Sequence, residues 1–153
     1  MALSKIKAST LPAGSVLQVQ TGILTTGGAL TASWADTGLS VTITPSSTSS
    51  KIWILMHTQT YNDANAGLGY KLFRGTTEIF DPNPDNGSGP LGQYTGGNNH
   101  YGPATLQYLD SPATTSATTY KIQARRYAAN AAHFLRDSTT DGKAYITAWE
   151  IAG

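Results

Sequence analysis

The sequence of 153 residues has no cysteine and little charge. Without cysteine, the chain has no disulfides, thiolate metal sites or thiol nucleophiles. Asp, Glu, Lys and Arg together make up 12% of the residues, and the formal net charge is +1. An ordinary soluble domain carries about twice that share of charged residues. So few charges cannot build a basic nucleic-acid-binding surface, and nucleic acid is therefore not an expected partner.

Long apolar runs are also missing. A membrane-spanning helix needs about 18 or more consecutive apolar residues, and the sequence has no such run. The segment Met1–Thr10 contains Lys5 and Lys7 but no apolar stretch of signal-peptide length. We therefore expect neither membrane insertion nor a secretory leader.

The residues that are abundant in place of charged ones favour β-structure. The sequence contains 22 Thr, 13 Ser, 16 Gly and 8 Tyr, a mixture typical of half-buried strands joined by tight turns. Only Ala124–Leu135, with its alanines, offers a helical alternative. The length suits one core, so we predict a single all-β domain, an antiparallel, jelly-roll-like β-sandwich of about eight to ten strands.

Alternation with a period of two places the strands. In residues 39–44, for example, Leu, Val and Ile alternate with Ser and Thr, which predicts one apolar and one hydroxylated face. Gly75 and Thr76 separate two strands as in a tight hairpin. The predicted strands are Ser15–Thr21, Leu39–Thr44, Lys51–Tyr61, Gly69–Arg74, Thr77–Phe80, Thr105–Asp110, Thr119–Arg126, Ala132–Arg136 and Ala144–Ile151, with Ile23–Thr26 as a further candidate.

Two of these strands are apolar on both faces. In Lys51–Tyr61, Ile52, Ile54 and Met56 lie on one face and Trp53, Leu55 and Tyr61 on the other. In Ala144–Ile151, Ile146 lies on one face and Tyr145, Trp149 and Ile151 lie on the other. A two-layer sandwich covers only one face of each sheet, so the second face needs another cover, most simply a neighbouring subunit. We therefore predict a subunit interface at Trp53, Leu55, Tyr145 and Trp149.

The N-terminal segment Met1–Gly14 and the segment Pro82–Pro103 lack this periodicity. Met1–Gly14 is predicted to be an N-terminal arm that docks on other proteins, ahead of a sandwich spanning residues 15–153. Pro82–Pro103 is predicted to be a long structureless loop, since it contains 6 Gly, 4 Pro and 4 Asn. Tyr94, Asn98, Asn99, His100 and Tyr101 within it match the composition of binding loops, although a plain surface loop or a subunit contact fits as well.

Signals for catalysis or metal binding are weak. The segment Asp81–Gly87 has oxygen ligands at alternate positions, but Gly87 falls one place late and two prolines stiffen the turn. A turn rich in Asp and Asn is the better interpretation of Asp81 and Asp85, and the cation site stays an open alternative. The other carboxylates mostly flank turns, and the three histidines are scattered. We predict no catalytic residues, no metal and no cofactor.

Several segments, taken in order, resemble a known class of proteins. They are Lys51–Leu55 (KIWIL), Leu72–Ile79 (LFRGTTEI), Tyr108–Pro112 (YLDSP), Thr118–Ile122 (TTYKI) and Ile146–Ile151 (ITAWEI). Together they resemble the small β-rich virion proteins of tailed phages, especially aquatic and cyanobacterial ones. Those proteins are similar to the trimeric jelly-roll heads of the complement globular-head and tumour-necrosis-factor type, which bury one sheet around a three-fold axis.

The resemblance implies a non-enzymatic homotrimer on the virion surface, a knob or fibre-like protein fixed to other virion proteins by the arm. Binding to a host-surface glycan or protein is the implied activity. A capsid decoration protein that reinforces the head is the main alternative, and a glycan-binding or glycan-cleaving module is a further one. The sequence before Ser15 has no collagen-like or heptad shaft, which favours a knob mounted directly on the particle.

Overall fold

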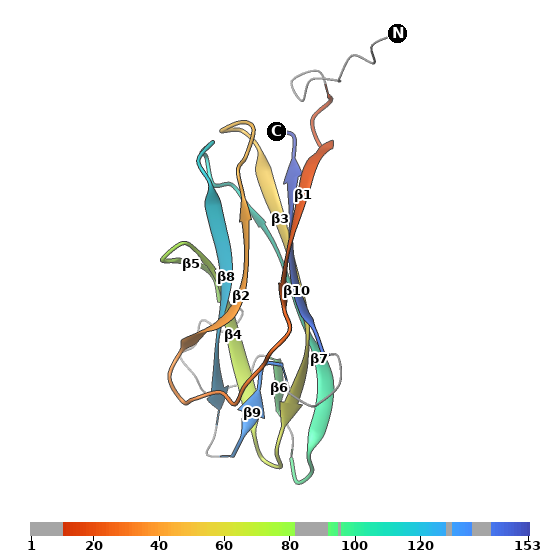
Figure 1. Ribbon diagram of the computed structural model, residues 1–153, viewed down its shortest axis with the longest axis vertical. Helices are drawn as coiled ribbons and strands as arrows, with labels where there is room; N and C mark the ends of the chain where they lie inside the picture. Colours follow the sequence, from red (N-terminus) through yellow and green to blue (C-terminus); the bar gives the residue numbers. More distant parts are fainter. Residues whose placement is uncertain (1–10, 82–91, 95, 128–129, 136–141) are drawn as a thin grey trace.

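The computed structural model describes residues 11–81, 92–94, 96–127, 130–135 and 142–153 (Figure 1). These residues form two antiparallel β-sheets that pack against each other, and none of them is helical. The predicted all-β sandwich is confirmed. The helical alternative for Ala124–Leu135 is wrong, because its described residues include the end of one strand and all of another. No helix in the described ranges could cross a lipid bilayer.

Sheet A has the strand order β1-β10-β3-β7, and the short β9 also pairs with β3. Its strands are β1 (Val16–Leu24), β3 (Lys51–Asn62), β7 (His100–Asp110), β9 (Ala132–His133) and β10 (Ala144–Ile151). Sheet B has the order β2-β8-β4-β5, and β6 pairs with β4. Its strands are β2 (Ala35–Ile43), β4 (Gly67–Arg74), β5 (Thr77–Phe80), β6 (Gly92–Tyr94) and β8 (Thr118–Tyr127). The chain crosses repeatedly between the two sheets.

The predicted strand boundaries are right where turn residues mark them. They are wrong where a strand continues to pair with its neighbour beyond the predicted end. β5 and β10 have the predicted ends, and Gly75 turns the β4–β5 hairpin with a φ of 59°. β1 continues to Leu24 as one strand. The prediction that Pro82–Pro103 is structureless throughout is wrong. It contains β6, and β7 already begins at His100, because β3 runs on to Asn62 and pairs with His100 there.

The core lies between the two sheets. Sheet A contributes Ile52, Ile54, Met56 and Ile146, and sheet B contributes Leu39, Val41, Leu72 and Ile122, all of them buried. Burial of a large aliphatic side chain stabilises the fold by roughly 1.5–3 kcal/mol. Tyr61, predicted on the outer apolar face, is only 8% exposed because the rings of Tyr101 and His133 pack against it.

A partly buried ion pair joins the two sheets, with Arg74 32% exposed and Asp110 7% exposed at their side chains. Arg74 Nη1 on β4 donates to both carboxylate oxygens of Asp110 on β7, at 2.9 and 2.8 Å. The hydroxyl of Tyr120 on β8 donates to Asp110 Oδ2 at 2.7 Å. Burial, together with this hydrogen bond to Asp110, raises the pKa of Tyr120 far above its ordinary value. Asp110 therefore has partners from two strands of the opposite sheet, as a buried carboxylate requires.

The chain enters and leaves the sandwich at the same end (Figure 1). The amide of Gly14 donates to the carbonyl oxygen of Ala152 at 2.8 Å, and the amide of Ala152 donates to Ser15 at 2.8 Å. The first ten residues of the predicted arm, Met1–Thr10, lie outside the described residues. We call this the terminal end and the opposite one, where β10 begins, the distal end.

Candidate functional site

The outer face of sheet A carries a row of apolar side chains that crosses all four main strands. Val19 on β1 lies opposite Trp149 on β10, Trp149 lies opposite Trp53 on β3, and Trp53 lies opposite Leu109 on β7. Val19, Trp53 and Leu109 are 50%, 39% and 52% exposed. We call these four residues the apolar row. Four apolar residues side by side form a contiguous exposed patch, which is typical of a surface that another molecule covers.

The four residues predicted for a subunit interface share this face. Trp53 and Trp149 belong to the apolar row, and Leu55, 41% exposed, lies two residues further along β3. Tyr145 is 39% exposed and lies further towards the distal end, opposite Ile23. The structure thus brings together residues from strands that are distant in the sequence.

The sequence analysis missed Val19, Ile23 and Leu109. Their own strands showed the right alternation, but only the strand register places them beside the tryptophans.

The outer face of sheet B is polar by contrast. Lys121 Nζ lies 2.8 Å from Asp36 Oδ2, and the hydrogen bonds from Lys121 and Gln123 hold the pKa of Asp36 below its ordinary value. Lys71 forms ion pairs of 2.9 Å with both Glu78 and Asp81. This difference between the two outer faces favours sheet A as the covered face and sheet B as the solvated one.

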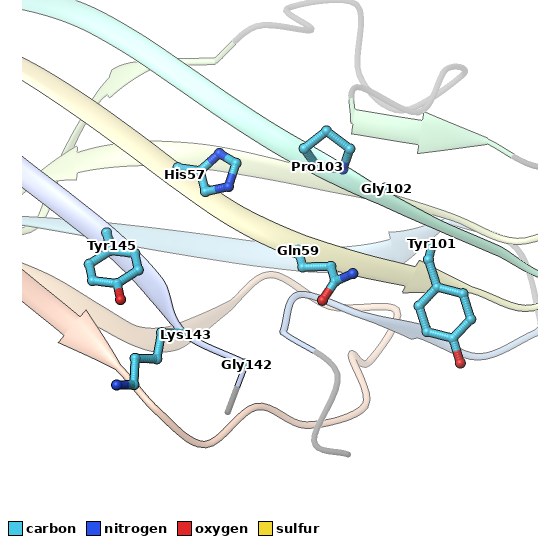
Figure 2. A pocket seen from close by; sticks show the side chains of 8 residues that line it. All are labelled: His57, Gln59, Tyr101, Gly102, Pro103, Gly142, Lys143 and Tyr145. Carbon is cyan, nitrogen blue, oxygen red and sulfur yellow. The ribbon is translucent and has the colours of Figure 1, made fainter. Parts of the chain in front are cut away.

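An open pocket of about 520 Å³ lies on the same outer face of sheet A, in its distal half (Figure 2). Its walls come from three adjacent strands and from the segment before β10. The lining residues are His57 and Gln59 from β3, Tyr101, Gly102 and Pro103 from β7, and Gly142, Lys143 and Tyr145 at the start of β10. We call it the distal pocket. It combines two aromatic rings with amide, imidazole and ammonium groups, the kinds of group that recognise polar ligands.

The five loop residues predicted for binding belong to different elements of the fold. Tyr101 lies on β7 and lines the distal pocket, with its ring 4.7 Å from that of Tyr61. His100 begins β7, and Asn98 and Asn99 precede it as exposed residues. Asn99 Oδ1 accepts the amide of Ala64 at 3.1 Å, so this side chain holds a neighbouring turn. The backbone of Tyr94 belongs to β6, and its side chain lies outside the described part of the structure.

A second buried carboxylate lies near the terminal end. Glu150 is fully buried, and its Oε1 accepts hydrogen bonds from the amide and hydroxyl of Ser46 at 2.7 and 2.6 Å and from Ser50 at 2.7 Å. Its Oε2 accepts one from Gln18 Nε2 at 2.6 Å. Burial raises the pKa of Glu150, but these hydrogen bonds outweigh burial and hold the pKa below its ordinary value. These hydrogen bonds hold β1 and the β2–β3 loop against β10, so we assign Glu150 a role in stability.

The carboxylates and histidines give no metal centre in the described ranges, where no group of three or more such residues could hold an ion. Asp81, the first residue of the calcium-like segment, forms an ion pair with Lys71. Pro82–Gly87, including Asp85, lies outside the described residues.

No protein-family model matches the sequence, and a search of curated proteins finds no relative.

Proposed function

We propose that the chain is a non-enzymatic structural protein of a phage particle, which assembles as a homotrimer through the outer face of sheet A. The trimer stands on the virion surface and contributes to binding of the host surface. The apolar row is the observation that carries this proposal. Its four residues lie on one open sheet face, while the charged pairs of the described residues lie elsewhere.

A second and a third copy of the chain are the cover that suits this face best. The outward positions of β1, β3, β7 and β10 include no carboxylate and one lysine, Lys51, while Lys143 lies just before β10 at the opposite end of the face. The central part is therefore uncharged and can be buried without leaving a charge unpaired. Three copies around a three-fold axis each present the same row to the next, and closed symmetry keeps the assembly finite. The resemblance to trimeric jelly-roll heads implies the same use of one sheet.

Both termini of the sandwich lie at the same end, and this supports the orientation of the proposed knob. Gly14 and Ala152 lie together at the terminal end, so an arm that precedes Ser15 emerges there. The distal end then faces away from the particle, and the distal pocket lies in that half of the sheet.

The mass of the full chain in solution, measured by light scattering or native mass spectrometry, tests the assembly. We expect a mass near three times 16.1 kDa. A monomer at micromolar concentration would contradict the proposed trimer. Immunogold labelling of phage particles with an antibody to the chain then tests its place on the virion, and particles without label would contradict the virion role.

A further inference from the structure

We propose that the distal pocket is a binding site for an acidic saccharide, a sugar that carries a carboxylate or phosphate group. This inference deepens the proposed function, because it names the chemical class of host-surface ligand that the trimer binds. It depends on the side chains of the pocket alone and not on the apolar row.

The charge of the pocket favours an anion. Lys143 is the cationic group among the described residues of its wall, His57 adds an imidazole, and none of these described residues is a carboxylate. Lys143 and His57 are both exposed, and neither side chain forms an ion pair or hydrogen bond with another described residue. An ammonium group that has no partner among the described residues can bind a ligand carboxylate or phosphate, and a charge-assisted hydrogen bond of this kind is stronger than a neutral one.

Neutral hydrogen-bonding groups complete the wall. The carboxamide of Gln59 and the hydroxyl of Tyr145 also make no side-chain hydrogen bond within the described part of the chain. A carboxamide both donates and accepts, and so does a phenol, which matches the hydroxyl groups of a sugar. In Figure 2, Gln59 lies between Tyr101 and Lys143, and His57 lies beside Tyr145.

The two tyrosines give the pocket its aromatic surfaces. Tyr101 is on β7 and Tyr145 is on β10, and β3 lies between these strands. Tyr145 lies opposite His57 and Tyr101 lies opposite Tyr61, four residues further along β3, so the two tyrosines stand about 10 Å apart across the strands and about 13 Å apart along them. A span of this size accommodates a short oligosaccharide, whose apolar ring faces can pack against the aromatic rings. The contact of Tyr101 with Tyr61 supports its ring on the protein side.

Size and position exclude the competing ligands. The volume of about 520 Å³ falls within the range of small-ligand pockets. A nucleic acid needs a track of several cations, and Lys143 is the single lysine or arginine among the described lining residues. The pocket overlaps the distal edge of the proposed interface at Tyr145 and extends beyond it, because Lys143 lies six residues before Trp149, about 20 Å in an extended chain. A trimer presents three such sites, so weak single sites can still give firm attachment.

A saccharide-array experiment with the full-length protein tests the proposal. The probes are oligosaccharides with terminal sialic acid, galacturonate or mannose 6-phosphate, with lactose and maltotriose as neutral controls. We expect at least one acidic probe to bind and the neutral probes not to bind. Absence of binding to every acidic probe, or equal binding to the neutral ones, would overturn the proposal.

Three variants assign the binding to the pocket. Lys143→Ala is expected to weaken the affinity for the acidic probe about tenfold or more, since it removes a charge-assisted contact. Tyr145→Phe is expected to weaken it a few-fold by loss of one hydrogen bond. Lys51→Ala is the matched control, because it removes the same charge from the other end of the same sheet face and is expected to leave the affinity within about twofold. Equal losses in Lys143→Ala and Lys51→Ala would mean general charge attraction and would overturn the site.

The mass of each protein separates this inference from the assembly. A trimer that binds no acidic saccharide would overturn the pocket proposal and leave the assembly standing. A monomer that binds and loses binding in Lys143→Ala would support the pocket and contradict the trimer.

Discussion

Trp53 and Trp149 lie directly opposite each other on β3 and β10, with ring centroids 5.3 Å apart and ring planes at 73°. This edge-to-face geometry is favourable for aromatic pairs and adds to the free energy gained from burying their surfaces. The pair stands on the open face of sheet A, between Val19 and Leu109, and not in the core. Two large aromatic side chains held in a fixed geometry on a surface are well suited to anchor a subunit contact.

Replacing Trp53 with Asp is expected to give a folded monomer. In the proposed trimer the new carboxylate would be buried without a partner, whereas in the single chain position 53 is open to water. Light scattering measures the mass, and circular dichroism checks that the sheets remain. The control is Ser40→Asp, which adds the same charge to the polar outer face of sheet B and is expected to leave the trimer intact. A Trp53→Asp protein that stays trimeric would contradict the proposed interface.

Replacing Tyr120 with Phe is expected to lower the free energy of unfolding by about 1.5–3 kcal/mol, because it removes a buried hydrogen bond to a charged carboxylate. Tyr70→Phe is a matched control, since its hydroxyl donates to the neutral carbonyl of Thr105 at 2.9 Å. The expected loss there is about 0.5–1.5 kcal/mol. Urea unfolding of both variants measures the difference. A larger loss for Tyr70→Phe than for Tyr120→Phe would contradict the importance assigned to Asp110.

The buried Glu150 is expected to make stability depend on pH. Its pKa in the folded chain lies below the ordinary value of 4.5, so in acid the unfolded chain takes up this proton first. The stabilisation from this carboxylate is therefore complete above about pH 4.5 and is lost as the pH falls through the folded pKa. Glu150→Gln is expected to cost about 1–3 kcal/mol at neutral pH. Urea unfolding at several pH values is the measurement.

Other carboxylates also titrate in this range, so the comparison of wild type with Glu150→Gln is what isolates Glu150. The gap in free energy of unfolding between the two proteins is expected to shrink as the pH falls. A gap that stays constant from neutral to acid pH would contradict the role assigned to the ionised carboxylate.

Replacing Gly22 with Ala is expected to destabilise the protein by about 1–3 kcal/mol, as overpacking in a well-packed site does. A Cβ at Gly22 would overlap the backbone oxygen of Ser40, because β1 and β2 approach closely there. Gly28→Ala is the control, since its added Cβ would meet no atom within 4 Å. Its effect is expected to stay within about 0.5 kcal/mol. Equal effects in thermal unfolding would contradict the close approach of these strands.

The sequence by itself determined the all-β class and which side chains of the two-faced strands share a face. Period-two alternation has a direct physical cause, the pleat of an extended chain. The pattern in Lys51–Tyr61 therefore placed Trp53 and Leu55 on one face of the strand and Ile52 and Ile54 on the other, without any tertiary information. The ends of β5 and β10 were equally readable.

Only the tertiary structure decided which distant residues meet. Strand order and register bring Val19 and Leu109 to the two tryptophans, bury Tyr61 under Tyr101, and gather His57, Gln59 and Lys143 around one pocket. The same holds for Asp110 and Glu150, which read in the sequence as turn-flanking carboxylates and lie buried among hydrogen-bond donors in the fold. The reason is that a strand pattern specifies the face on which a side chain lies, whereas its neighbours across the sheet are set by pairing between segments far apart in the chain.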